Sequence, residues 1–99
     1  MAVGQVFKGF VSLEPGEEVS IRPSSGVEAI VHNIYTSGMA SLYLTNGTDN
    51  ILIDSITSDY GAWVDFKFHI TNDYYLKVKS LEVSRTINIA WDGVITYEE

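Results

Sequence analysis

Two residues of the chain are suited to acid–base chemistry at neutral pH, His32 and His69, and none of the 99 residues is cysteine. Cysteine nucleophiles, thiolate zinc sites, iron–sulfur clusters and disulfides are therefore excluded. His69 alternates with Asp65 and Lys67 along an extended run, where every second residue lies about 7 Å further along one face. Asp65 and His69 are thus too far apart for a hydrogen bond. We interpret His69 as a solvent-exposed or interface histidine, and we predict that the protein is not an enzyme.

His32 lies between Ile30 and Ile34, which favours a buried, hydrogen-bonded histidine over a metal ligand. At a subunit contact such a histidine would make assembly sensitive to pH. Calcium takes six to eight oxygen ligands, but Asp and Asn are typical of turns in any case, because their side chains bond their own backbone. No segment has EF-hand spacing, and no glycine-rich phosphate loop is present. We predict no catalytic, cofactor or metal residues. The Asp and Asn residues in predicted turns are Asn46, Asp49, Asn50, Asp54, Asp59, Asn72 and Asp73.

Four aromatic residues surround two adjacent predicted loops and form a candidate contact patch: Tyr60, Trp63, Tyr74 and Tyr75. Tyrosine and tryptophan present an apolar ring with a polar group, which suits protein interfaces and stacking on sugars. The same residues also occur as packing that covers the edge of a sandwich. The sequence leaves these three interpretations open.

Short apolar runs separated by turn signals must position these side chains, and no amphipathic helix is evident. Runs at this spacing are typical of antiparallel β-sandwiches or barrels, and the short connections leave no room for crossover helices. We predict a single domain over residues 1–99, an all-β, antiparallel, jelly-roll-like sandwich of about eight strands. The expected strands are residues 5–13, 19–21, 27–35, 41–45, 51–56, 63–71, 74–79 and 87–91, with a possible ninth at 94–97.

The run 27–35 is apolar on both alternating faces, which predicts a strand covered on both sides. One side would face the core, and the other a subunit contact or a covering loop. The candidate interface residues are Val27, Ala29, Val31, His32 and Tyr35.

Two later runs alternate between apolar and polar residues, and in the first of them the apolar side is expected to face the core. In 63–71 that side carries Val64, Phe66, Phe68 and Ile70, with Trp63 opposite. In 74–79, Tyr74, Leu76 and Val78 lie on the face opposite to Tyr75, Lys77 and Lys79.

The charge is strongly acidic, with 13 carboxylates against six Lys and Arg, for a net charge of −7. Nucleic acid and anionic membranes are poor partners for such a chain, because both are bound mainly by clustered cations. The negative charge either keeps the protein soluble, because copies repel one another, or complements a basic surface on a partner. Residues 1–10 lack the basic and apolar regions of a signal peptide, so we expect synthesis in a cytoplasm.

Seven segments of the chain together carry a resemblance to a known family. The segments are Leu13-Glu14-Pro15-Gly16-Glu17-Glu18, Ser20-Ile21-Arg22-Pro23, the run 25–35, Leu42-Tyr43-Leu44-Thr45-Asn46-Gly47, Phe68-His69-Ile70-Thr71-Asn72, Tyr75-Leu76-Lys77-Val78-Lys79 and Trp91-Asp92-Gly93-Val94. In this order they resemble small all-β structural proteins of tailed bacteriophages, of the capsid-decoration or head-accessory type. The resemblance covers about residues 13–97, and its turns of the P-G-E and T-N-G kind occur in many sandwiches.

The resemblance implies a non-enzymatic virion protein on the outer surface of the head, made in the host cytoplasm. Such a protein stabilises the capsid by bridging its subunits, often as a homotrimer, so the expected partners are other copies of the chain and the major capsid protein. The alternative hypothesis is a carbohydrate- or receptor-binding sandwich of a tail fibre or baseplate, which the loop aromatics favour.

Overall fold

The structure, a computed structural model, describes residues 3–99 and is an all-β sandwich of two antiparallel sheets. In the described residues no helix is long and apolar enough to cross a membrane. The strands are β1 (Val6–Leu13), β2 (Glu18–Ile21), β3 (Val27–Thr36), β4 (Ala40–Thr45), β5 (Asn50–Ile56), β6 (Gly61–Trp63), β7 (Phe68–Ile70), β8 (Tyr75–Ser80) and β9 (Ile87–Glu98).

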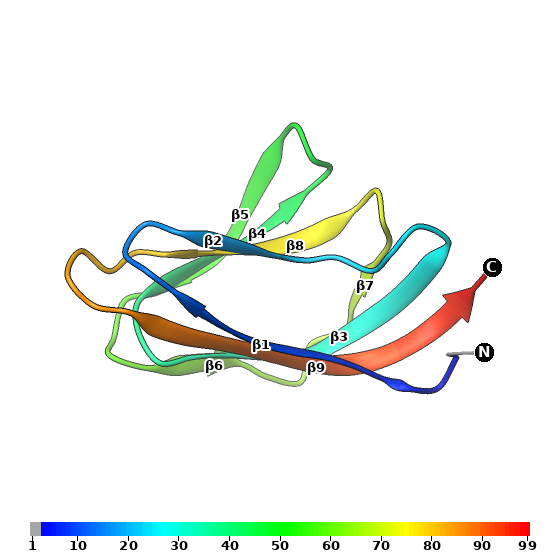
Figure 1. The fold of residues 1–99 in the computed structure, drawn as a ribbon, viewed down its shortest axis with the longest axis horizontal. Coiled ribbons are helices and arrows are strands. Elements are labelled where there is room, and N and C mark those ends of the chain that lie inside the picture. The colour runs from blue at the N-terminus through cyan, green and yellow to red at the C-terminus, as the bar shows by residue number, and fades with distance from the viewer. Residues whose placement is uncertain (1–2) are drawn as a thin grey trace.

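The strand order confirms the jelly roll. One sheet, here called sheet A, runs β1-β9-β3-β6 with β7 also paired to β3, and the other, sheet B, runs β2-β8-β4-β5. The first strand pairs with the last, the second with the second last, and so inward to the β4–β5 hairpin, as in a long hairpin wrapped around a core (Figure 1). Since β6 and β7 lie along one partner strand, they correspond to one interrupted strand, which gives the predicted eight.

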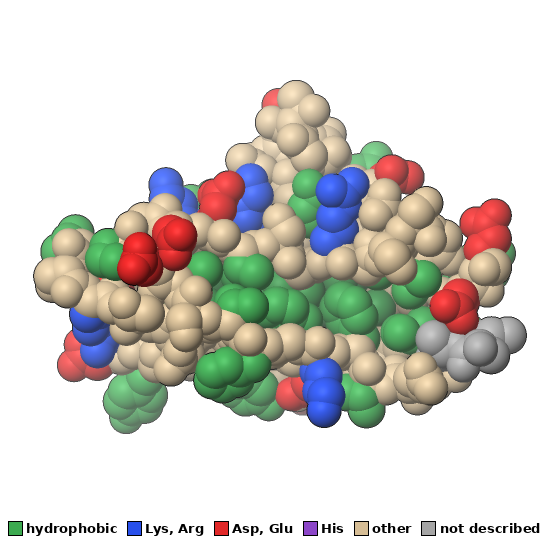
Figure 2. All heavy atoms as spheres, in the orientation of Figure 1, with side chains coloured by type: hydrophobic (Ala, Val, Ile, Leu, Met, Phe, Trp, Pro, Cys, Tyr) green, Lys and Arg blue, Asp and Glu red, His purple; other side chains and the backbone are tan. Residues whose placement is uncertain are grey.

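The core lies between the two sheets and is built from the inward side chains of both. The first and last strands contribute Leu13, Ile87 and Ile89, which are buried, and Phe7 and Val11, which pack against the core. Figure 2 shows apolar side chains between the two layers. The fully or nearly buried apolar residues are Leu13, Ile21, Ala29, Val31, Ile34, Ala40, Leu42, Trp63, Ile70, Leu76, Val78, Ile87 and Ile89.

A β-bulge explains why β3 is apolar on both alternating faces. Val31 pairs with Gly93 and Asn33 with Asp92, so His32 is an extra residue with no partner on β9. The bulge reverses the alternation, which brings Ile34 to the same inward face as Ala29 and Val31. The expected second apolar face is therefore wrong. Gly93 permits the close approach at this point, because a Cβ there would collide with the Ile30 carbonyl.

The same bulge interrupts the partner strand, so the expected single strand 63–71 is wrong. β3 pairs with β6 beyond the bulge and with β7 before it. Between them, Phe66 N–H donates to His32 O at 3.0 Å and Asp65 N–H to Asn33 Oδ1 at 3.0 Å. Asp65 has a left-handed backbone with φ of 62°, which breaks the alternation. Trp63 and Ile70 consequently face the core, while Val64 is exposed.

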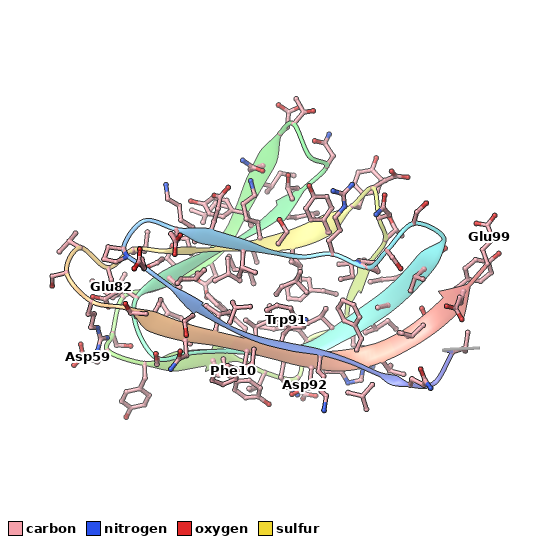
Figure 3. All side chains as sticks on the ribbon, viewed as in Figure 1. Phe10, Asp59, Glu82, Trp91, Asp92 and Glu99 are labelled. Atoms are coloured by element: carbon pink, nitrogen blue, oxygen red, sulfur yellow. The ribbon has the colours of Figure 1, made fainter. Side chains whose placement is uncertain are left out.

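A second close approach fixes the inward face of β1 against β9. Gly9 pairs with Trp91, and the indole ring lies over the glycine, so that a Cβ at position 9 would overlap the ring. Trp91 is thereby held between the layers, as Figure 3 shows.

Candidate interaction surfaces

The two histidines lie apart from any metal-like cluster. His69 Nε2 is 3.1 Å from Glu28 Oε1, and both side chains are well exposed. His32 is exposed, because the bulge turns it out of the core, so the expectation that it is buried is wrong. Within residues 3–99 no three His, Cys, Asp or Glu side chains lie close enough to hold a metal ion.

The five candidate interface residues of β3 do not share a surface. Ala29 and Val31 are fully buried against the core and cannot contact a second subunit. Val27 is half-buried near the end of the strand. Only His32 and Tyr35 are exposed. The error has the same cause as the double apolar pattern, since the bulge turns Ile34 toward the core and Tyr35 toward the outer face.

The four candidate aromatic residues do not form a patch either. Trp63 faces the core and is 3% exposed, and its indole Nε1–H donates to Asp54 Oδ2 at 2.9 Å across to β5. Tyr75 is 7% exposed, and the Arg22 guanidinium lies over its ring at 4.4 Å, in cation–π geometry. Its neighbour Tyr74, by contrast, is 60% exposed.

The two exposed members of that set line different hollows. Tyr60 lines one with Phe10 and Tyr35, on the outer face of sheet A. Tyr74 lines another with Leu44 and Ile51, beside the β4–β5 hairpin.

The first of these hollows contains an aromatic group that comes from three distant segments. Phe10 of β1 pairs with Ala90 of β9, and Ala90 pairs with Tyr35 of β3, so the three form a row across the outer face. Tyr60, in the loop before β6, completes the group. Phe10 is 71% exposed and Tyr60 78%. We call Phe10, Tyr35, Tyr60 and Ala90 the outer aromatic surface; the hollow that it lines has a volume of about 340 Å³.

Hydrogen bonds hold the polar surroundings of this surface in place. The Tyr35 hydroxyl donates to Asp92 Oδ2 at 3.1 Å, and Asn33 Nδ2 donates to Asp92 Oδ1 at 2.8 Å. The hydrogen bond to the Asp92 carboxylate, with lesser contributions from desolvation and from the charge of Asp92, raises the pKa of Tyr35. Figure 3 shows Phe10 and Asp92 on the side of the β1–β9 pair opposite to Trp91. The arrangement presents apolar rings beside fixed polar groups, as protein interfaces and sugar sites both do.

A second apolar surface lies at the free edge of sheet B. Among the strands of residues 3–99, β5 pairs with β4 alone and projects with it from the body of the sandwich (Figure 1). A register shift opposite Leu42 and Tyr43 leaves Ile53 unpaired. Ile51, Leu52 and Ile53 are all exposed, and the only charged residue of the strand is Asp54. An uncharged apolar strand edge is a template for pairing with another strand. We call residues 50–54 the β5 edge.

Both surfaces have a signal in the sequence that strand counting overlooks. Phe10 alternates with Lys8, opposite to the inward residues Phe7 and Val11, so an aromatic ring falls on the polar face of its strand. Ile51, Leu52 and Ile53 are three consecutive apolar residues, and one of any two neighbours on a strand must face away from the core.

No protein-family model matches the chain, and no curated protein sequence is significantly similar to it.

Proposed function

We propose that this chain is a non-enzymatic structural protein of a tailed-bacteriophage virion, which binds the outer surface of the capsid and stabilises it by bridging capsid subunits. The observation that carries the proposal is the outer aromatic surface. Phe10 and Tyr35 project from one face of sheet A and Tyr60 from the loop beside it, and cores of protein interfaces are enriched in such residues and poor in charge. The resemblance of segments 13–97 to decoration proteins supplies the shell as the partner.

The charge of the chain fits this role. Asp92 accepts a hydrogen bond from the Tyr35 hydroxyl, and Asp59 directly precedes Tyr60 in the chain. Two carboxylates therefore border the outer aromatic surface, and the whole chain carries a net charge of −7. A basic rim on the capsid would therefore attract the acidic sandwich, while copies bound at neighbouring sites repel one another. Electrostatic attraction of this kind weakens as salt screens it.

The test uses tailed-phage particles produced by the cells or phage that encode the chain. Mass spectrometry of purified heads should detect the protein, and stripped heads should regain resistance to heat-induced DNA release when the recombinant protein is added. Phe10→Ser should lose binding to stripped heads. Val83→Ser is the matched control, since Val83 is 88% exposed in the β8–β9 loop and lies outside the surface.

Absence of the protein from the particles would overturn the proposal. So would heads whose stability is the same with and without it. Binding that Phe10→Ser leaves unchanged would overturn the assignment of the outer aromatic surface.

A second candidate is the carbohydrate- or receptor-binding module, which a different group of rings now favours. Aromatic rings around a hollow with a nearby amide, such as Asn88, are suited to stacking and hydrogen bonding with a sugar. Ser12 Oγ donates to Asn88 Oδ1 at 2.8 Å, which orients the amide. A glycan array should then give a signal that Phe10→Ala and Tyr60→Ala abolish. A blank array with wild-type protein excludes this candidate for the sugars on that array.

A further inference from the structure

We propose that two copies of the chain pair through the β5 edge, antiparallel across a two-fold axis. The two copies of sheet B, with four strands each, then form one continuous sheet of eight. This inference goes beyond the proposed function and does not rest on it, because it follows from the edge strand alone.

The main chain of the β5 edge has groups available for pairing. Asn46 N–H donates to Asp49 O at 3.3 Å, which closes the hairpin turn. Bonded and non-bonded pairs alternate along an antiparallel ladder, so the pairs of Asn50 with Thr45 and of Leu52 with Tyr43 are non-bonded. The N–H and C=O groups of Asn50 and Leu52 therefore point toward the free edge.

The side chains are complementary to themselves in the register that these groups favour. With Leu52 of one copy opposite Leu52 of the other, each Leu52 exchanges two main-chain hydrogen bonds with its counterpart. Ile51 then faces Ile53, so the exposed apolar residues cover one another. Beyond this pair, the register shift at Ile53 turns Asp54 toward Trp63 of sheet A, so the self-complementary part of the edge is residues 51–53.

The charge of the edge favours a second copy as the occupant. The chain as a whole carries −7, but residues 50–56 contain a single carboxylate, and its Oδ2 already accepts the Trp63 indole N–H. Two copies thus approach through a part of the surface that is low in charge, without the lysines or prolines that protect many edge strands. The remaining repulsion between the acidic bodies is long-ranged, so added salt should strengthen the dimer.

A contact of one strand with itself closes at two copies. The trimer expected from the resemblance is a different assembly, and the mass in solution distinguishes the two. Light scattering coupled to size exclusion, from micromolar to millimolar protein and at low and high salt, should give twice the 11.0 kDa mass of the chain at high concentration.

Charge substitutions at the axis test the register. Leu52 is 57% exposed, so a polar residue there is compatible with the fold, which circular dichroism and thermal melting should verify. Leu52→Lys alone and Leu52→Glu alone each place like charges opposite one another, and both should halve the mass at millimolar protein. An equal mixture of the two variants should recover the dimer, because lysine then faces glutamate. Val83→Lys adds the same charge to another exposed apolar position and should leave the dimer unchanged.

A wild-type protein that stays monomeric at millimolar concentration and high salt would overturn the proposal, as would a species of three times the chain mass. A dimer that survives Leu52→Lys would place the contact elsewhere. A mixture that fails to recover the dimer would overturn the two-fold register. Because these measurements involve no shell, their outcome is separate from that of the binding test on phage heads.

Discussion

At the scale of single residues, Glu82 and Arg85 fasten three loops at one end of the sandwich. Glu82 Oε2 accepts Met39 N–H at 2.9 Å and Arg85 Nη2 at 3.1 Å. Arg85 Nη2 also donates to the carbonyl oxygens of Ser37 and Asp59, at 3.2 and 3.1 Å. Figure 3 shows Glu82 and Asp59 at the same end of the molecule. This pair therefore joins the loops that follow β3, β5 and β8.

The pair predicts a pH dependence of stability. The hydrogen bond from Arg85, and next the one from Met39 N–H, lower the pKa of Glu82 from its ordinary value of 4.5. Since the folded pKa is the lower one, this stabilisation is complete above 4.5 and is lost as the pH falls through the lowered pKa. Glu82→Gln should have a lower free energy of unfolding than wild type at pH 7. The difference in unfolding free energy between the two proteins should shrink below pH 4.5. Urea unfolding at a series of pH values measures this difference. A difference in unfolding free energy that stays constant with pH would contradict the prediction.

The fate of the candidate aromatic residues shows what sequence reasoning misses at this scale. Trp63 and Tyr75 lie beside predicted loops, as exposed contact residues do. In the structure they are buried and contact Asp54 and Arg22, which come from other strands or loops and whose proximity only the folded topology reveals. The outer aromatic surface depends on pairing in the same way, since Phe10 and Tyr35 meet only because both flank Ala90.

At the scale of elements, the spacing of apolar runs and turns was sufficient to predict an all-β jelly roll with the strands at nearly the right places. It was not sufficient to predict the bulge at His32, because a bulge is set by the pairing of β3 with β9. The pattern in 27–35 is consistent with two covered faces or with one face and a bulge. The break between β6 and β7 follows from the bulge. Missing the bulge at His32 therefore also gave a wrong prediction of which side chains in 63–71 face the core.

The bond between Trp63 and Asp54 gives a prediction at this scale, because it ties β6 of sheet A to the edge strand of sheet B. Asp54→Ala leaves the buried indole N–H without its acceptor, which should cost about 1–3 kcal/mol of unfolding free energy. Asp54→Asn retains an acceptor oxygen and should cost less. Urea unfolding of dilute protein, followed by tryptophan fluorescence, measures both. Asp73→Ala, at an exposed turn position, is the control; equal losses in the Ala and Asn variants would show that the bond does not stabilise the fold.

At the scale of the whole molecule, the wrapped topology joins segments far apart in the chain. Val6 pairs with Val94, and Val19 with Val78. The long chain segment between two paired residues must close into a loop before the pair can form, and this closure costs entropy. Proteins dominated by distant pairings therefore fold slowly. We expect refolding from urea in milliseconds to seconds, observed by stopped-flow fluorescence of the tryptophans, and refolding in microseconds would contradict this.

The pairing of the first and last strands also has a mechanical consequence. β1 and β9 are antiparallel neighbours, so the start of β1 and the end of β9 lie at the same end of the sandwich (Figure 1). A force that pulls these ends apart loads the ladder from Val6 and Val94 onward, one pair after another, as in opening a zipper. A force applied across the faces loads many pairs at once. The sandwich is therefore weakest against tension between its termini, and an attachment that must bear load is better made through its faces or through the β5 edge.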